Sequence, residues 1–370
     1  MKNLFIGVMS GTSLDGIDVA LCTFEANACE LIATHFLAYP TELKLELLAL
    51  HKPEANELET TLLLGNKLAS LYAEAVNKVL VSAKKSANDI AAIGCHGQTI
   101  RHRPELGFTL QIGNAALLAE LTNITVVSDF RSRDIAAGGQ GAPLVPAFHK
   151  AIFASNKLNR AIINIGGIAN ITYLSKNADE SDFGSVIGFD SGPGNMLLDA
   201  WAKLKLGKDF DADGAWAATG VVHESLLNNM LAEPYFALPP PKSTGRDLFN
   251  DDWLKQHILY PHCRPQDIAR TIVELSAYSI CQALTKYCVD VDEVYLCGGG
   301  ARNSLLVNTL KTMLKDTPVL DTDALGVGVD WLEAVAFAWL AKQTIENKPS
   351  NLPAVTGAKG LRVLGAIYLA

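Results

Sequence analysis

The chain repeats one order of structural signals in its two halves, and this repeat restricts the fold more than any other feature. In the first half, apolar segments at 3–9 and 17–24 flank a polar turn that contains glycine, which predicts a hairpin. A third apolar segment follows at 30–39. An amphipathic pattern then predicts a helix over 57–83, and a short buried strand at 90–95 ends in Gly-Cys-His-Gly.

The second half contains the same signals in the same order. A hairpin pattern covers 161–174 with glycines at its tip, and an apolar period of three to four residues predicts a helix over 268–287. A strand at 294–296 then ends in Cys-Gly-Gly-Gly. Residue identity between the halves is slight, so only the pattern repeats. A chain of 370 residues has room for two domains. The repeat therefore predicts two similar α/β lobes around a cleft.

Composition excludes several other classes of protein. The formal net charge of −8 argues against a nucleic-acid binder, which needs a basic surface to neutralise phosphates. No segment approaches the roughly 18 apolar residues of a membrane span, and the first residues do not resemble a signal peptide. The 7 cysteines are scattered without a C-x-x-C pair, which fits neither a zinc cage nor a disulfide framework. The sequence is therefore expected to be cytoplasmic.

Four glycine-rich turns, at 7–16, 166–170, 188–195 and 298–303, are candidate phosphate-binding sites. Glycine allows the backbone to approach a ligand closely, and successive amides can point at phosphate oxygens. The 11–16 turn has the glycine spacing of a Walker A loop, but Ile17 and Asp18 replace the required Lys and Ser/Thr. No dinucleotide fingerprint and no nucleophile elbow occur. The acidic turn at 209–214 resembles an EF-hand loop but has Gly220 where calcium needs a glutamate.

Longer motifs carry a resemblance to a known family. The segments at 8–18, 94–99, 129–134, 164–170, 188–195, 239–249 and 331–334 closely resemble signatures of the 1,6-anhydro-N-acetylmuramic acid kinases. The resemblance spans nearly the whole chain; Ser191 stands where threonine is expected, and the hydroxyl is kept. It implies an α/β fold of two ribonuclease-H-like lobes, as in the actin, hexokinase and chaperone ATPase superfamily.

The resemblance also implies a domain division and a reaction. Lobe I would comprise 1–135 plus about 345–370, with the first phosphate hairpin and part of the sugar site. Lobe II would comprise 136–344, with the second phosphate hairpin, the catalytic aspartate, the adenosine turn and an insertion at about 206–266. The enzyme would use ATP and Mg²⁺ to open the 1,6-anhydro ring with water and phosphorylate O6. The products would be N-acetylmuramic acid 6-phosphate and ADP, in peptidoglycan recycling and amino-sugar degradation.

The resemblance assigns ATP to the glycine turns. The ATP-binding residues would be Gly11, Thr12, Ser13, Leu14, Asp15, Gly16, Ile17, Asp18, Gly166, Gly167, Asn170, Gly298, Gly299, Gly300 and Asn303. Backbone amides and the two hydroxyls of the first turn are suitable phosphate donors. Asp15 or Asp18 would hold Mg²⁺, since magnesium sites combine one or two carboxylates with substrate phosphates. The alternatives are a plain turn residue for Asp15, an edge-strand carboxylate for Asp18 and a helix residue for Asn303.

The catalytic residues implied are Asp190 and Glu333. Asp190 is expected just after a strand at 185–189, where it would act as base on a water that attacks C1. Its alternative role is to cap the turn before the segment 196–204. Glu333 opens an apolar helix and would help to hold the water or the sugar; its alternative role is to complement the helix dipole.

The sugar would be bound by His96, Gln98, Thr99 and Arg131. A guanidinium group matches the lactyl carboxylate of the substrate, and Arg133 is the competing candidate. Either arginine could instead pair with Asp129 or Asp134, and His96 could be an ordinary buried histidine. The partners implied are this small-molecule substrate and a second subunit in a homodimer, with lobe closure on binding. Two other functions compete: a nucleotide-gated clamp that closes on a protein partner, and a kinase of a different sugar.

Overall fold

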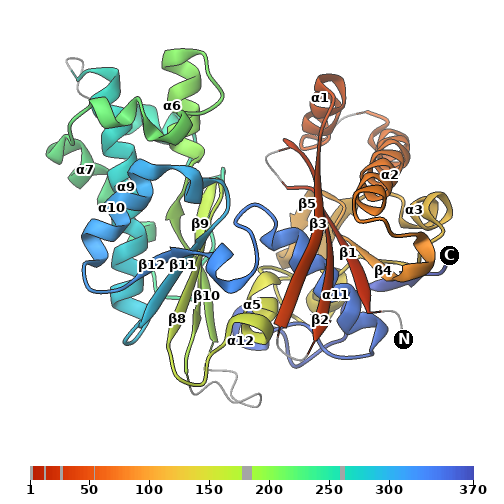
Figure 1. The fold of residues 1–370 in the computed structure, drawn as a ribbon. Helices are drawn as coiled ribbons and strands as arrows, with labels where there is room; N and C mark the ends of the chain where they lie inside the picture. The colour runs from red at the N-terminus through yellow and green to blue at the C-terminus, as the bar shows by residue number, and fades with distance from the viewer. Residues whose placement is uncertain (1–2, 12–13, 26–27, 54, 177–185, 259–262) are drawn as a thin grey trace. The chain divides into compact units, whose positions relative to one another are not determined.

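The computed structural model describes residues 3–11, 14–25, 28–53, 55–176, 186–258 and 263–370. The chain forms two compact units, with residues 1–152 and 331–370 in unit 1 and residues 153–330 in unit 2. Each unit is a sheet covered by helices (Figure 1). Among the described residues, no helix is both long enough and apolar enough to cross a membrane.

Unit 1 is built on a six-stranded sheet with the order β13-β7-β4-β1-β2-β3. Its strands are β1 (Leu4–Met9), β2 (Gly16–Glu25), β3 (Ala28–Ala38), β4 (Ile90–Cys95), β7 (Val126–Ser128) and β13 (Ala366–Tyr368). Its helices are α1 (Thr41–Ala49), α2 (Glu57–Ser82), α3 (Ala115–Thr122), α4 (Ser132–Ala136), α5 (Val145–Phe153), α11 (Leu332–Ile345) and α12 (Pro353–Thr356). A separate hairpin pairs β5 (Gln98–Arg103) with β6 (Phe108–Ile112).

Two helices cover opposite faces of the unit 1 sheet. Leu64, Leu68 and Val76 of α2 pack on apolar side chains such as Ile6 and Val8, which point to one face of β1. On the other face, Gly7 of β1 and its neighbour Gly94 of β4 meet the backbone of α11. A Cβ atom at Gly7 would lie 1.7 Å from the carbonyl oxygen of Ala334. The two glycines therefore let the helix lie directly on the strands.

Unit 2 is built on a five-stranded sheet with the order β10-β9-β8-β11-β12. Its strands are β8 (Arg160–Ile165), β9 (Ile168–Leu174), β10 (Val186–Pro193), β11 (Glu293–Cys297) and β12 (Val319–Asp321). Its helices are α6 (Met196–Leu206), α7 (Glu224–Leu231), α8 (Asp251–His257), α9 (Pro265–Tyr287) and α10 (Ser304–Leu314). The expected insertion contains α7, α8 and short 3₁₀ turns, and its aromatic residues Phe236, Phe249 and Trp253 are buried in the core of the unit.

The two sheets share one topology. In unit 1, β1, β2 and β3 form an antiparallel meander, and β4 and β7 add in parallel beside β1. In unit 2, β8, β9 and β10 form the meander, and β11 and β12 add in parallel beside β8. This is the ribonuclease-H-like strand order, so the two-lobed α/β fold expected from the repeat is confirmed.

The chain divides between the units at other positions than expected. Unit 1 extends to residue 152 and resumes at 331, instead of ending at 135 and resuming near 345. The reason is α11, which lies on the glycines of β1 and β4 and so belongs to the core of unit 1. Glu333 consequently lies in unit 1 and Asp190 in unit 2.

Candidate active site

Three glycine turns of unit 2 meet at the end of β8. The β8–β9 turn at Gly166 and Gly167 accepts hydrogen bonds from Gly194 N (2.9 Å, to Gly167 O) and Asn195 N (2.8 Å, to Gly166 O). A Cβ atom at Gly298 or Gly300 would lie within 3.0 Å of the carbonyl oxygen of Ile165. These turns therefore pack backbone to backbone, which leaves little room for side chains between them. The fourth turn, at 7–16, lies in unit 1.

Asn303 has a structural role at the start of α10. It is the N-cap of α10, and its Oδ1 accepts a hydrogen bond from Leu306 N at 3.1 Å. The residue is only 7 % exposed. Asn303 is therefore a helix cap, and a nucleotide contact through this side chain remains a prediction.

Asp190 lies inside a strand and not after one, so its expected position was wrong. β10 continues to Pro193, and Asp190 pairs with Asn170 of β9. The register shifts between Asp190 and Gly192, which makes Ser191 an extra residue in the strand. Such a β-bulge turns side chains away from their regular alternation. The N-cap of α6 is Asn195, and Asp190 Oδ2 instead accepts a hydrogen bond from Thr244 N at 3.0 Å.

The environment of Asp190 favours its protonated form. Burial raises the pKa of the Asp190 carboxyl from 3.8 to about 6. The Thr244 amide and the charge of Lys242 oppose this rise, because both stabilise the carboxylate. A carboxyl group with a pKa near 6 can accept a proton at neutral pH and release it again.

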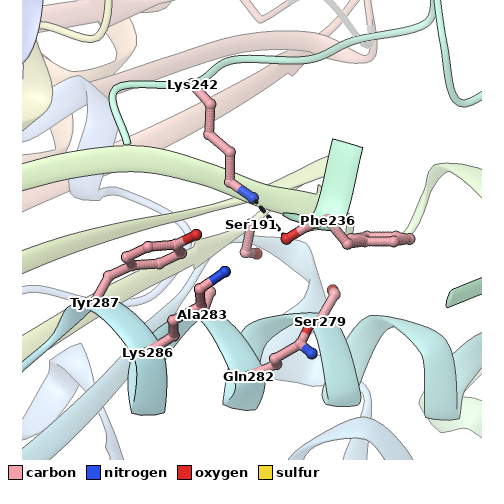
Figure 2. Close-up of a pocket in the computed structure, with 8 residues that line it drawn as sticks. All are labelled: Ser191, Phe236, Lys242, Ser279, Gln282, Ala283, Lys286 and Tyr287. Atoms are coloured by element: carbon pink, nitrogen blue, oxygen red, sulfur yellow. Dashed lines mark hydrogen bonds between the residues drawn. The ribbon is translucent and has the colours of Figure 1, made fainter. Parts of the chain in front are cut away.

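A small pocket lies beside this aspartate in unit 2 (Figure 2). It is lined by Ser191, Lys242, Lys286, Tyr287 and neighbouring residues of α9 and of the 3₁₀ turn at 234–237. Lys242 Nζ donates hydrogen bonds to the carbonyl oxygens of Tyr235 (3.3 Å) and Phe236 (3.5 Å). Burial, and then the charge of Lys286, lower the pKa of Lys242, while Asp190 opposes the change.

In unit 1, a buried hydrogen-bond network supports the first glycine turn. Ser10 Oγ donates to Gln98 Oε1, so Tyr39 must donate its hydroxyl proton to Ser10 Oγ, at 2.6 Å. Gln98 Nε2 donates to the carbonyl oxygen of Gly11 at 3.2 Å. Gln98 is fully buried, so its side chain fixes the turn from within. Thr99 is half-buried, and its hydroxyl oxygen accepts a hydrogen bond from Gln111 Nε2 at 3.2 Å.

Part of the first turn presents only its backbone. The side chains of Leu14 and Ile17 are buried at 1 % and 0 % exposure, so only their main-chain groups are available to a ligand. Thr12 and Ser13 lie outside the described residues. Asp15 is exposed and pairs with Lys44 at 3.4 Å, whereas Asp18 is half-buried in β2. No cluster of three or more acidic, histidine or cysteine side chains suitable for a metal occurs in the described part of the chain.

His96 and Arg131 form a buried pair. Arg131 donates to His96 Nε2 from both Nε (3.1 Å) and Nη2 (2.9 Å), and its Nη1 donates to Gly141 O at 2.8 Å. Burial and the nearby guanidinium hold the pKa of His96 well below 6.5. The imidazole is therefore neutral, accepts at Nε2 and carries its proton on Nδ1. His96 is thus a buried histidine that accepts two hydrogen bonds from Arg131 and so orients the guanidinium group.

Neither expected alternative partner neutralises Arg131. Asp129 accepts a hydrogen bond from the hydroxyl of Ser132. Asp134 accepts hydrogen bonds from Gly141 N, Asn351 Nδ2 and Thr356 Oγ1. Among the described residues, no ion pair joins either aspartate to Arg131 or Arg133. Burial lowers the pKa of Arg131 to about 10, and the charge of Glu333 opposes this change. Unit 1 therefore brings His96, Arg131 and Glu333 together, with Glu333 half-buried in the first turn of α11.

Sequence reasoning missed three residues around Asp190. Tyr235, Lys242 and Thr244 all contact this residue or its support, although they lie 45 to 54 positions away in the chain. Lys242 and Thr244 belong to the 239–249 segment, which the sequence marked as a family motif without assigning its individual residues to the site. Ser10 and Tyr39 were likewise missed as the supports of Gln98.

The fold class and a comparison with known proteins together identify the family of the chain. Two units with the ribonuclease-H-like strand order, each with a glycine-containing turn after its first strand, define a protein of the actin-like ATPase fold class. A family model described as anhydro-N-acetylmuramic acid kinase matches residues 3–370. The chain therefore belongs to the anhydro-N-acetylmuramic acid kinase family, and it is a kinase that acts on a small sugar.

Two relatives that carry the name of the family support the assignment. A protein of that name from Nitrosospira multiformis is 53 % identical over 366 residues, which cover 98 % of each chain. One from Coxiella burnetii is 52 % identical over 373 residues, covering 99 % of this chain and 98 % of the relative. A solved structure, component A of the (R)-2-hydroxyglutaryl-CoA dehydratase of Acidaminococcus fermentans, aligns with a TM-score of 0.48 at 14 % identity, covering 90 % of this chain and 96 % of that one. Membership of a kinase family implies that ATP supplies the phosphoryl group.

Proposed function

We propose that the chain converts 1,6-anhydro-N-acetylmuramic acid, ATP and water into N-acetylmuramic acid 6-phosphate and ADP. Water attacks C1 of the sugar while the bond from C1 to O6 breaks. O6 takes the γ-phosphoryl group, and the proton of the water passes to the Asp190 carboxylate. The reaction belongs to peptidoglycan recycling, and the family resemblance favours a cytoplasmic homodimer.

One observation carries the assignment of the base. Asp190 stands on a β-bulge, with Oδ2 held by Thr244 N at 3.0 Å and a pKa raised to about 6. Among the described residues, Oδ1 has no bonded donor, so this oxygen is available to a water molecule. A carboxylate suits the task because C1 gains positive character as the bond to O6 breaks.

The sugar contacts follow from the buried charge in unit 1. Arg131 is oriented by a neutral histidine, and a substrate carboxylate would give it the anionic ligand that guanidinium groups bind best. We assign the lactyl carboxylate to this site. Glu333 lies near enough to influence Arg131 and would help to hold the water or the sugar. Of the remaining candidates, Thr99 offers a half-buried hydroxyl, while His96 and Gln98 act through Arg131 and Gly11.

Nucleotide binding is assigned to the glycine turns, including Gly11, Gly166, Gly167, Asn170 and Gly298 to Gly300. Mg²⁺ would neutralise charge on the transferring phosphoryl group. A site of one or two carboxylates plus phosphates agrees with the acidic residues of the first turn. Either Asp15, which is exposed and pairs with Lys44, or Asp18, which is half-buried in β2, would supply the carboxylate.

The test measures ADP release with Mg-ATP and the anhydro sugar, and identifies the product by mass because water must add as well as phosphate. Wild-type protein should show sugar-dependent turnover, and Asp190→Asn should lose it by at least about 100-fold, the usual effect of removing a general base. Asp316→Asn, which changes an exposed carboxylate in a turn after α10, is the control and should keep wild-type turnover. Slow ATP hydrolysis that is indifferent to the sugar would overturn the proposal.

A further inference from the structure

The segment from Tyr235 to Thr244 holds Asp190 at three separate atoms. Asp190 N donates to the carbonyl oxygen of Lys242 at 3.1 Å. The hydroxyl of Tyr235 donates to the carbonyl oxygen of Asp190 at 2.8 Å, and Thr244 N donates to Oδ2 at 3.0 Å. Both main-chain groups and one carboxylate oxygen of Asp190 are therefore fixed by residues outside its own sheet.

Lys242 joins the two ends of this segment. Its carbonyl oxygen accepts a hydrogen bond from Asp190 N, and its ammonium group donates hydrogen bonds to the carbonyl oxygens of Tyr235 and Phe236. The ammonium nitrogen also lies 4.6 Å from the centre of the Tyr235 ring, within the range of a cation–π contact. In the described chain, no carboxylate lies within 4.0 Å of this nitrogen. Asp190 raises the pKa of Lys242, so the two opposite charges attract each other.

We propose that Lys242 is a positioning residue for the reaction: its ammonium group ties the Tyr235–Thr244 segment against Asp190 and keeps the buried carboxylate ionised. The contacts fix Oδ2 on Thr244 and leave Oδ1 as the oxygen that accepts the proton. The inference rests on the proposed role of Asp190 as base. It adds a residue that touches neither the sugar nor the nucleotide in that proposal.

The charges around Asp190 agree with this role. Burial raises the pKa of Asp190, and the Thr244 amide and the Lys242 charge both act against the rise. Burial, and then the charges of Asp190 and Asp247, raise the pKa of Tyr235, so the phenol remains a donor. Lys286 of α9 and Lys242 both lie near the ring of Tyr287, with Nζ 5.1 Å from the ring centre for Lys286 and 5.9 Å for Lys242 (Figure 2). Lys286 donates to Ala237 O at 3.5 Å.

The experiment compares the pH dependence of kcat for sugar-dependent ADP release in four proteins. Wild type should lose activity below about pH 6, where Asp190 becomes protonated. Lys242→Met should move this acid limb upward by about half to one pH unit, since an opposite charge nearby is removed. Turnover at pH 6 should then fall by about two- to five-fold and recover most of its loss by pH 8.5. Lys242→Arg should restore the limb because the charge remains.

Lys286→Met is the matched control, because it removes a lysine from the same pocket without touching the Tyr235–Thr244 contacts to Asp190. Its acid limb should stay at the wild-type position. A Lys242→Met limb that does not move, or a Lys286→Met limb that moves equally, would overturn the inference. Lys242→Gln repeats the test with a polar side chain if the methionine variant does not fold.

A second measurement does not depend on catalysis. In protein labelled with ¹³C at aspartate carboxyl carbons, the Asp190 resonance is the one that disappears in Asp190→Asn, and its titration midpoint is followed by NMR. The midpoint should rise in Lys242→Met and not in Lys286→Met. If Asp190→Asn stays active, the base assignment fails while this titration still decides the effect of Lys242. A midpoint unchanged by Lys242→Met would refute the effect even in an active enzyme.

Discussion

Replacing the proposed base should make the protein more stable at neutral pH. The pKa of Asp190 is raised from 3.8 to about 6 in the folded protein. One pKa unit corresponds to about 1.36 kcal/mol, so keeping Asp190 ionised in its buried place costs about 3 kcal/mol of folding free energy. Asparagine avoids this cost and keeps an oxygen that can accept from Thr244 N. Asp190→Asn should therefore gain stability while it loses turnover.

The sign of the pH dependence follows from proton binding. Between about pH 3.8 and pH 6 the folded protein binds more protons at Asp190 than the unfolded chain does. Stability therefore falls as the pH rises through this window, and the loss is complete above the folded pKa. The stability advantage of Asp190→Asn should be near zero at pH 4 and approach about 3 kcal/mol, as an upper limit, at pH 7.5.

Urea unfolding of wild type and Asp190→Asn at several values between pH 4 and pH 7.5 measures this advantage directly. The fluorescence of Trp201 and Trp253, both buried in unit 2, reports the transition. Asp316→Asn should show no such trend, since its side chain is exposed. An Asp190→Asn protein that is less stable than wild type at pH 7.5, or a difference that stays constant across the window, would refute the reasoning.

Two further pairs of variants test unit 1. Gly7→Ala should destabilise the protein by about 3 kcal/mol or more, because its Cβ would lie 1.7 Å from Ala334 O. Gly65→Ala, within α2, is the control: its Cβ would make only ordinary contacts at 3.6 Å, so it should stabilise the protein by up to about 1 kcal/mol. Urea midpoints compare the two, and equal effects would contradict the close packing of α11. Arg131→Lys should raise the KM for the sugar about tenfold or more with a smaller change in kcat, because lysine cannot donate two parallel hydrogen bonds. Steady-state kinetics with Arg133→Lys as control measures this, and a larger effect at the exposed Arg133 would reverse the assignment.

Much of the fold could be predicted from local pattern. The strands at 90–95 and 294–296 and the helices at 57–83 and 268–287 agree with β4, β11, α2 and α9 to within three residues. Apolar periodicity is a local property, so it reports elements well. The domain boundary was wrong because the packing of α11 on Gly7 and Gly94 joins residues more than two hundred positions apart.

The candidate site, like the fold, could be predicted only in part. Asp190 and Arg131 stand in conspicuous motifs, and the sequence singled them out. The bulge at Ser191 leaves no signal in the sequence, so Asp190 was placed after the strand instead of within it. The neutral state of His96 depends on the guanidinium of Arg131 and on burial, and neither is visible before the chain is folded. The contact of Thr244 with Asp190 is likewise a product of tertiary structure.

The order of the units along the chain has a consequence for synthesis. Unit 2 is continuous, whereas unit 1 is interrupted by it and is completed by residues 331–370. A nascent chain that ends before residue 331 contains all of unit 2 but lacks α11, which covers β1 and β4, and β13, which pairs with β7. Contacts between residues distant in sequence form slowly. The sheet that is made first should thus be the last to mature, because one of its apolar faces stays accessible to chaperones until residues 331–370 have been synthesised.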